Sequence, residues 1–211
     1  MTGSGGAESV EIELTFDVDD DTALPDFTDL PGVVRVVGPE HRDLDARYLD
    51  VADVALGRTG YALRRRTGGP DEGWHIKGPR GADGGRLETH WPLDEGGDGA
   101  TVPDVVARAV GEIAPGALTP LARIRNARTA FALTDADSAL VAEFVDDRVR
   151  ATDERRGSAS SWREWEFELG PAAPSDPAGR AALLAAATAA VERAGGRAAA
   201  SDSKLARTLG L

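Results

Sequence analysis

Acidic side chains recur at every second position in two segments of the sequence. Glu11 and Glu13 lie near the N-terminus, and Glu164, Glu166 and Glu168 repeat the spacing near the C-terminus. Residues two apart in a β-strand point to the same face, so the carboxylates of each segment would lie side by side. Carboxylate oxygens are the ligands that hard cations such as Mg²⁺ and Mn²⁺ prefer. The acidic segments therefore predict a site for such a cation.

Basic side chains show the same spacing in other segments. They occur in YALRRR, WHIKG and RLETHW, as Arg64 with Arg66, His75 with Lys77, and Arg86 with Glu88 and His90. Guanidinium groups bind phosphate oxygens in a fork geometry, and an ammonium group neutralises their charge. If the acidic and basic faces share one cavity, they would form a site for a metal-bound phosphate chain. The alternative is that they are solvent faces of half-buried antiparallel strands, which also alternate.

The composition limits the classes of function. The 36 acidic against 24 basic residues give a formal net charge of −12, which opposes binding to nucleic acid or to an anionic membrane. The sequence has no cysteine, so disulfides and thiolate zinc sites are excluded, and carboxylates, histidine or water must hold any metal. No window approaches the roughly 20 apolar residues that span a bilayer, and the start MTGSGGAES lacks a secretory signal. We expect a cytoplasmic protein.

The charged segments belong to alternating stretches that are typical of β-strands. In the first stretch the glutamates alternate with the apolar residues Val10, Ile12, Leu14 and Phe16. Further strands are expected at 32–37, 46–51, 59–67, 73–77, 85–91, 121–133, 139–149 and 161–169. The polar faces of these strands must meet for the charges to form one site.

Helical patterns are fewer than strand patterns. Helices are expected at 103–110, at 201–209, and at 177–194 with a start near Ser175 or Asp176 and a stop at Gly195. This balance predicts a β-rich α+β domain, and closure into a barrel would remove the exposed strand edges. Trp74 and Trp165 lie on the opposite parity to the charges, so we expect them outside the barrel, where helices would cover them.

The order of these motifs resembles the CYTH domain, a family named after bacterial adenylate cyclase and thiamine triphosphatase. The resemblance covers about residues 9–209 and rests on Glu-x-Glu, LRRR, WHIKGP, RLE, RIRNARTAF, VAEFVDD, EWEFEL and SKLARTL, in that order. It implies a closed eight-stranded antiparallel β-barrel, the triphosphate tunnel of this family of metalloenzymes, with a few flanking helices. We expect a single tunnel domain over residues 9–211 after a disordered segment 1–8.

The resemblance also implies roles for individual residues. The implied ligands of Mg²⁺ or Mn²⁺ are Glu11, Glu13, Asp147, Glu166 and Glu168. The implied phosphate-binding residues are Arg64, Arg66, Lys77, Arg86, Arg125, Arg128 and Lys204. Glu88 and Glu166 are the implied catalytic acids, Glu88 by orienting the bases or a water. Arg125 and Arg128 are three residues apart, so both face the tunnel only if their strand contains a bulge.

One position departs from the family pattern. The opening motif is usually Glu-x-Glu-x-Lys, and Thr15 stands at the lysine position here. The substitution removes one inward cation near the phosphates or the attacking water. Two alternatives therefore stay open. Either another base compensates for the missing lysine, or catalysis is weak or lost.

These observations predict a metal-dependent phosphohydrolase that acts on inorganic triphosphate or a related triphosphate-containing substrate. The alternative is a catalytically weak or inactive module that binds triphosphate or polyphosphate, with a helical histidine-rich, polyphosphate-associated domain as partner in the same chain or another. Adenylate cyclase and thiamine triphosphatase activities are weaker alternatives. A barrel that binds nothing would bury many charges without compensation. No nucleic-acid or membrane partner is expected.

Overall fold

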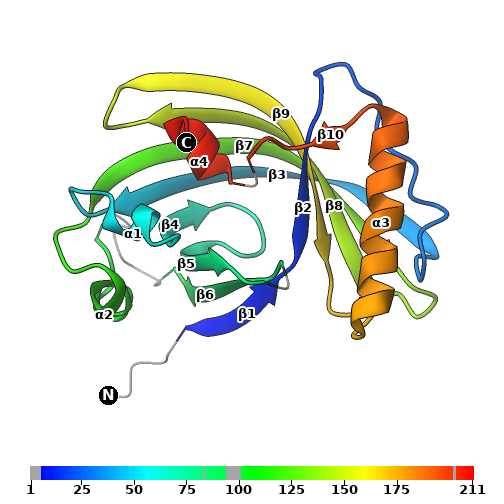
Figure 1. Cartoon of the computed structure of the whole chain (residues 1–211), viewed down its shortest axis with the longest axis horizontal. Helices are drawn as coiled ribbons and strands as arrows, with labels where there is room; N and C mark the ends of the chain where they lie inside the picture. Colours follow the sequence, from blue (N-terminus) through cyan, green and yellow to red (C-terminus); the bar gives the residue numbers. More distant parts are fainter. Residues whose placement is uncertain (1–5, 83, 94–100, 202) are drawn as a thin grey trace.

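The structure, a computed structural model, describes residues 6–82, 84–93, 101–201 and 203–211. The strands of this part form one antiparallel sheet in the order β1-β6-β5-β4-β3-β7-β8-β9-β2-β10 (Figure 1). Their bounds are β1 Ala7–Glu11, β2 Glu13–Asp17, β3 Arg35–Asp50, β4 Ala62–Thr67, β5 Gly73–Arg80, β6 Arg86–Pro92, β7 Thr119–Thr134, β8 Leu140–Asp153, β9 Ser158–Leu169 and β10 Arg197–Ala198. The helices are α1 Ala55–Arg58, α2 Asp104–Ile113, α3 Pro177–Ala194 and α4 Lys204–Leu209. The predicted β-rich α+β class is confirmed.

The predicted closed eight-stranded barrel is not confirmed, because the sheet has ten strands in one open order. β1 pairs with β6, and β2 pairs with β9. Only Ile12 separates β1 from β2, and its carbonyl accepts a hydrogen bond from the Leu169 N–H at 2.9 Å. One unbroken strand was predicted for the first segment. The structure has two strands instead, and because they are consecutive in the chain, they connect β6 to β9, which lie far apart in the order of the sheet.

Strand β3 is one long strand where the sequence predicted two. Gly38 and Pro39 interrupt the pattern, so residues 38–45 were not predicted as a strand. In the structure β3 continues past them, and its pairing with β7 shifts register between Val37 and Glu40. A bulge of this kind absorbs a proline without ending the strand. β3 therefore pairs with β7 from Arg35 to Asp50.

The ends of α3 agree with the prediction from the sequence. Pro177 occupies the first turn, and the side chain of Asp176 accepts a hydrogen bond from the Gly179 N–H at 2.8 Å. Gly195 adopts a left-handed conformation at φ 102°, which glycine adopts without steric cost and which ends the helix. Helix α4 begins at Lys204, later than predicted, because the Ser203 side chain caps it by accepting from the Ala206 N–H.

Helices cover much of the outer face of the sheet. Helix α3 packs over β2, β8 and β9 with Trp165 in the apolar cluster between them, and Figure 1 shows α3 along that side of the sheet. Helix α2 packs over β4 to β6, where Trp74 is buried against Val106 and Val110. The predicted outward packing of Trp74 and Trp165 is confirmed. The apolar clusters under α2 and α3 lie on the outer face of the sheet, while a third cluster, with Ala46, Tyr48 and Ile124, reaches the cavity wall.

Strand β1 begins at Ala7, so the disorder predicted for 1–8 does not hold for Ala7 and Glu8. Residues 1–5 of that segment lie outside the described residues. In the described part of the chain, no helix is long and apolar enough to cross a membrane.

Candidate functional site

The inner face of the sheet encloses a cavity of about 320 Å³. Strands β2, β3, β4, β5, β7 and β9 and helix α4 all contribute side chains to its wall. The wall includes ten of the predicted site residues: Glu11, Glu13, Arg64, Arg66, Lys77, Arg86, Arg128, Glu166, Glu168 and Lys204. The structure thus gathers acids from both ends of the sequence and bases from its middle, as the parity of the strands predicted.

The bases of the cavity have hydrogen-bond donors without partners. The Nε atoms of Arg64, Arg66 and Arg86 are buried and make no hydrogen bond within the described residues. Burial, together with Arg64 and Arg128, lowers the pKa of Arg66 to about 9. Buried donors of this kind are costly unless an acceptor reaches them. The Nε donors of these arginines therefore suit an anion with several oxygens, while other nitrogens of Arg64 and Arg66 contact Glu88 and Asp71.

Glu88 lies behind the bases, buried at 4% exposure, and does not line the cavity. Its carboxylate is 3.1 Å from the Lys77 Nζ and 3.7 Å from Arg64, and it accepts a hydrogen bond from His75 Nδ1 at 2.5 Å. Burial raises the pKa of Glu88, but the hydrogen bond from His75 and the charge of Arg64 outweigh burial and lower it. Glu88 is thus placed to orient bases. Burial also lowers the pKa of His75 to about 4, so this histidine is neutral at pH 7.

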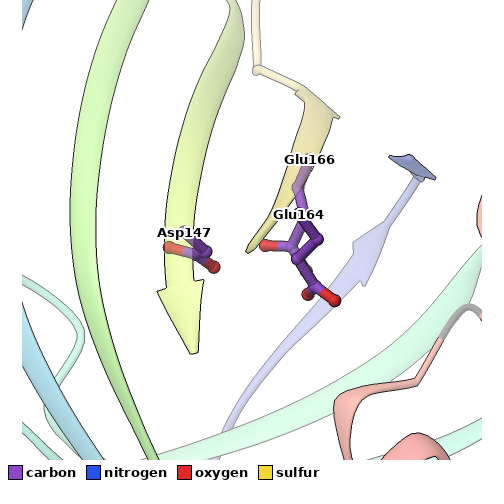
Figure 2. Close-up of side chains that lie close together, drawn as sticks. All are labelled: Asp147, Glu164 and Glu166. Atoms are coloured by element: carbon purple, nitrogen blue, oxygen red, sulfur yellow. The ribbon is translucent and has the colours of Figure 1, made fainter. Parts of the chain in front are cut away.

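Three carboxylates form what we call the inner acid cluster: Asp147 of β8 with Glu164 and Glu166 of β9 (Figure 2). Their oxygens lie within 4.8 Å of one another. The Lys204 Nζ contacts all three, at 3.0 Å for Asp147 and 2.5 Å for Glu166, and Arg128 contacts Asp147 and Glu166 at 2.7 Å each. Burial raises the pKa of Glu166, but Lys204 and Arg128 outweigh burial and lower it. Protein cations therefore already contact all three carboxylates, although burial and the charge of Glu166 raise the pKa of Glu164.

A second set of carboxylates, which we call the N-terminal acid cluster, comprises Glu11, Glu13 and Glu168. Glu13 lies directly opposite Glu168 in the ladder of β2 and β9, and Lys77 contacts Glu11 at 2.5 Å. Burial, reinforced by Glu11 and Glu13, raises the pKa of Glu168 to about 8. Burial and the charge of Glu166 also raise the pKa of Glu13. Negative charge is in excess here.

The N-terminal acid cluster fits a hard divalent cation better than the inner acid cluster does. Its oxygens are not gathered within 4.8 Å, as those of Asp147, Glu164 and Glu166 are. Mg²⁺ commonly uses one or two carboxylates and completes its shell with waters and phosphate oxygens, so tight gathering is not required. Burial, with the charges of Glu11 and Glu13, raises the pKa of Glu168, and a bound cation would favour its ionised form. Glu13 and Glu168 would therefore hold the ion.

Arg125 is the predicted site residue that the structure places elsewhere. Its side chain is 57% exposed and approaches Asp45 at 3.5 Å on the outer face of the sheet, while Arg128 lines the cavity. Ile124 and Asn126 also line the cavity, so β7 keeps its regular alternation from Ile124 to Arg128 and has no bulge there. The alternation of β7 brings Arg125 outside, away from the other predicted phosphate-binding residues.

Sequence reasoning missed Arg42, which lines the cavity from β3. Its guanidinium donates two hydrogen bonds to Glu143, each at 3.0 Å, and two to Glu40. The signal was the alternation of Arg42, Leu44, Ala46 and Tyr48, all of which line the cavity. Gly38 and Pro39 concealed it by interrupting the strand pattern.

Thr15 faces the same side as the acids, because it lies directly opposite Glu166 in the ladder. Its hydroxyl is buried and has no hydrogen-bond partner among the described residues. The cation beside Glu166 comes instead from Lys204, which α4 delivers from the C-terminal part of the chain. The loss of a lysine at position 15 therefore does not leave Glu166 without a basic partner.

A model of the CYTH domain matches residues 9–185 of this sequence. The chain belongs to the CYTH domain family. The match spans the Glu-x-Glu strand, the basic strands β4 to β6 and the acidic strand β9, and it ends inside α3. The predicted family is confirmed.

Solved structures share the CYTH fold of this chain. The bh2851 protein of Bacillus halodurans, a proposed adenylate cyclase, has a TM-score of 0.64 at 16% identity, over 95% of this chain and 97% of that chain. The PH1819 protein of Pyrococcus horikoshii has a TM-score of 0.56 at 14% identity, over 95% and 98%. HpAC1 of Hippeastrum, described with a dominant triphosphatase activity, has a TM-score of 0.55 at 16% identity, over 95% of both chains. At these identities the likeness shows the fold alone.

Two curated relatives from Mycobacterium tuberculosis are nearer in sequence. Rv2226 of strain H37Rv and MT2285 of strain CDC 1551 are each 38% identical to the chain over 216 residues. The alignment covers 97% of this chain but 41% of each relative. The chain thus spans less than half of the length of these curated relatives.

Proposed function

We propose that this CYTH domain hydrolyses a terminal phosphoanhydride bond of inorganic triphosphate, with Mg²⁺ or Mn²⁺ held by Glu13 and Glu168. The observation that supports it most directly is the set of buried guanidinium donors without partners, on Arg64, Arg66 and Arg86. A triphosphate supplies several oxygens to such donors and carries the charge that they would neutralise.

The bases and acids of the cavity have separate tasks in this proposal. Arg64 and Arg66 would bind the oxygens of the triphosphate. Lys77 would lie between the triphosphate and the N-terminal acid cluster and would contact both. Arg128 would approach the chain from β7 while Asp147 and Glu166 hold its guanidinium in place. Most of the rate enhancement would come from positioning and charge neutralisation, as in other phosphoryl transfers.

A bound divalent cation would neutralise phosphate oxygens and lower the pKa of a coordinated water. Water then adds to the terminal phosphorus as the bond to the bridging oxygen breaks, which yields phosphate and diphosphate. Glu166 and Glu88 would act differently from one another. Glu166 lines the cavity and can contact the substrate, while Glu88 acts as a positioning residue through Lys77 and Arg64.

The second candidate is a module that binds triphosphate or polyphosphate without turnover. Thr15 supports it, because the buried hydroxyl offers no charge at the position where the family motif usually has lysine. Lys204 supports the enzyme instead, because its ammonium group contacts the carboxylate opposite Thr15. Measurement of turnover and affinity in the same preparation distinguishes the two.

The test is phosphate release from inorganic triphosphate with Mg²⁺ and with Mn²⁺, alongside calorimetric binding of triphosphate without metal. The Glu13→Gln variant should lose metal-dependent release while still binding triphosphate. Glu192→Gln on α3, which is exposed and outside the cavity, is the matched control. Binding without release by the wild-type protein would favour the binding module, and faster turnover of ATP or thiamine triphosphate would replace the proposed substrate.

A further inference from the structure

A second basic surface lies on the outer face of the sheet, opposite to the cavity. Five arginines point to it from strands β3, β4, β7 and β8, and we call this set the outer arginine face: Arg47, Arg65, Arg123, Arg125 and Arg150. Arg47, Arg125 and Arg150 are exposed, and Arg65 and Arg123 are half-buried. The same strands present the cavity-lining residues on their other face, so the two basic surfaces lie back to back.

The ladder register sets like charges directly opposite one another on this face. Arg47 lies opposite Arg65 on one side and opposite Arg123 on the other, and Arg125 lies opposite Arg150. Directly opposed like charges destabilise a sheet. Three such pairs on adjacent strands are a cost that neutral residues would avoid. An arrangement of this kind is expected where an anion binds.

Few acids compensate these arginines. Asp45 contacts both Arg123 and Arg125, so one carboxylate serves two guanidinium groups. Within the described residues, Arg47, Arg65 and Arg150 form no ion pair, and the Nε of Arg65 is buried without a hydrogen-bond partner. The face is therefore locally positive on a chain whose formal net charge is −12.

A groove of about 580 Å³ opens at this face. Its wall consists of Arg123, Arg125, Arg150, Ala151, Thr152, Glu154, Ala159, Ser160 and Ser161. Hydroxyl groups thus stand beside three guanidinium groups, with Glu154 as the acid in the wall. Guanidinium and hydroxyl donors together suit phosphate oxygens, because both donate and neither needs an apolar ligand surface.

We propose that the outer arginine face is a second anion site that binds linear inorganic polyphosphate, separate from the cavity. A nucleic acid fits less well, because the groove wall has no aromatic side chain on which a base could stack. An acidic peptide also fits less well. Its apolar anchors would find only Ala151 and Ala159, and β7 and β8 are paired on both edges, which prevents strand addition.

The site does not depend on turnover in the cavity. Its affinity should fall steeply with salt, because guanidinium groups that bind a polyanion release counterions. It should also persist when triphosphate fills the cavity. These two properties distinguish the outer arginine face from the cavity in one experiment.

The experiment measures binding of long-chain polyphosphate to the full chain by fluorescence anisotropy, with saturating triphosphate present and over a range of salt. The test variant is Arg47→Gln with Arg150→Gln, and the control is Arg108→Gln with Arg193→Gln, two exposed arginines on α2 and α3. We expect the test variant to weaken polyphosphate binding about tenfold and to reduce the salt slope by about two. The control should bind as the wild type does.

Triphosphate binding to both variants reports on the cavity alone, and polyphosphate binding in the presence of triphosphate reports on the outer arginine face alone. The failure of one proposal can therefore be told from the failure of the other. Polyphosphate binding that triphosphate abolishes, or that the test variant leaves unchanged, would overturn the proposal. Stronger binding of single-stranded RNA or polyglutamate than of polyphosphate to the same arginines would also overturn it, because the face would then serve another class of partner.

Discussion

The two acid clusters contain the same kind of group but differ in how many protein cations contact them. In the inner acid cluster, Lys204 and Arg128 neutralise carboxylates from β8 and β9, and the pKa of Glu166 is lowered. In the N-terminal acid cluster, Lys77 contacts Glu11, and the pKa of Glu168 is raised to about 8. The comparison teaches that carboxylate proximity does not by itself indicate a metal site. The N-terminal acid cluster, which has fewer cation contacts among the described residues, is the better place for a bound ion.

The largest expected effect follows from removing the N-terminal acid cluster. The double variant Glu13→Gln with Glu168→Gln should reduce metal-dependent phosphate release at least about 100-fold, because the ion loses its carboxylate ligands. Steady-state assays over a range of Mn²⁺ concentrations would measure it. Triphosphate affinity without metal should stay equal or increase, since two negative charges are gone. An unchanged metal dependence would move the cation site to another set of residues.

The next effect comes from breaking the inner acid cluster. Lys204→Met should lower the free energy of unfolding by roughly 3 kcal/mol, because it leaves buried carboxylates without their ammonium partner. Lys204→Arg, which keeps the charge, is the control. Chemical denaturation gives the value, and added Mn²⁺ should restore part of the stability of Lys204→Met by replacing the ammonium. Equal stability of both variants would contradict the assignment of Lys204 as the neutralising group.

The clusters should also differ in how pH affects stability without metal. The raised pKa of Glu168 means that the folded protein keeps a proton which the unfolded chain releases between about pH 4.5 and 8. Stability should therefore fall as pH rises through this window. Glu168→Gln should remove the fall and raise the thermal midpoint at pH 8 by at least about 3 °C. A scanning calorimetry series from pH 5 to 8 measures it, and identical profiles would show that Glu168 is ionised throughout.

Glu166 should show the opposite dependence. Its lowered pKa means that its contribution to stability is present above the ordinary glutamate value and is lost as pH falls below it. The Glu166→Gln variant should therefore approach the wild type in stability only at acid pH. A constant difference between the two proteins from pH 3 to 8 would count against the pairing with Lys204 and Arg128.

The smallest expected effect concerns Arg42, which the sequence did not reveal. Arg42→Gln should weaken triphosphate affinity by about fivefold, because the guanidinium lines the cavity but already donates to Glu40 and Glu143. Calorimetry with and without metal gives the affinity. Arg35→Gln on the same strand, which donates to the Ala136 carbonyl outside the cavity, is the matched control. An effect as large as that of Arg64→Gln would give Arg42 a direct place on the phosphate chain.

Much of the site was predictable because strand parity is a local property. The two-residue spacing of Arg64 with Arg66 and of Glu166 with Glu168 placed these pairs in the wall of one cavity, as the structure shows. The caps of α3 were equally local, since Asp176 and Gly195 act on their own helix. The same parity puts Arg125 outside once Arg128 faces the cavity, and only the structure showed that β7 has no bulge between them. Arg42 was hidden because the bulge at Gly38 and Pro39 resembles a strand end.

The sequence by itself determined which residues share a strand face, because side chains alternate with a period of two whatever the strand later pairs with. It also determined the charge of each face and the family to which the chain belongs. Only the tertiary structure decided which acids meet which bases. Lys204 reaches Glu166 across 38 residues of sequence, and Lys77 reaches Glu11 across 66. Coulomb energy depends on distance and burial in the folded chain, so the sequence could not show that the two acid clusters differ in their contacts with protein cations.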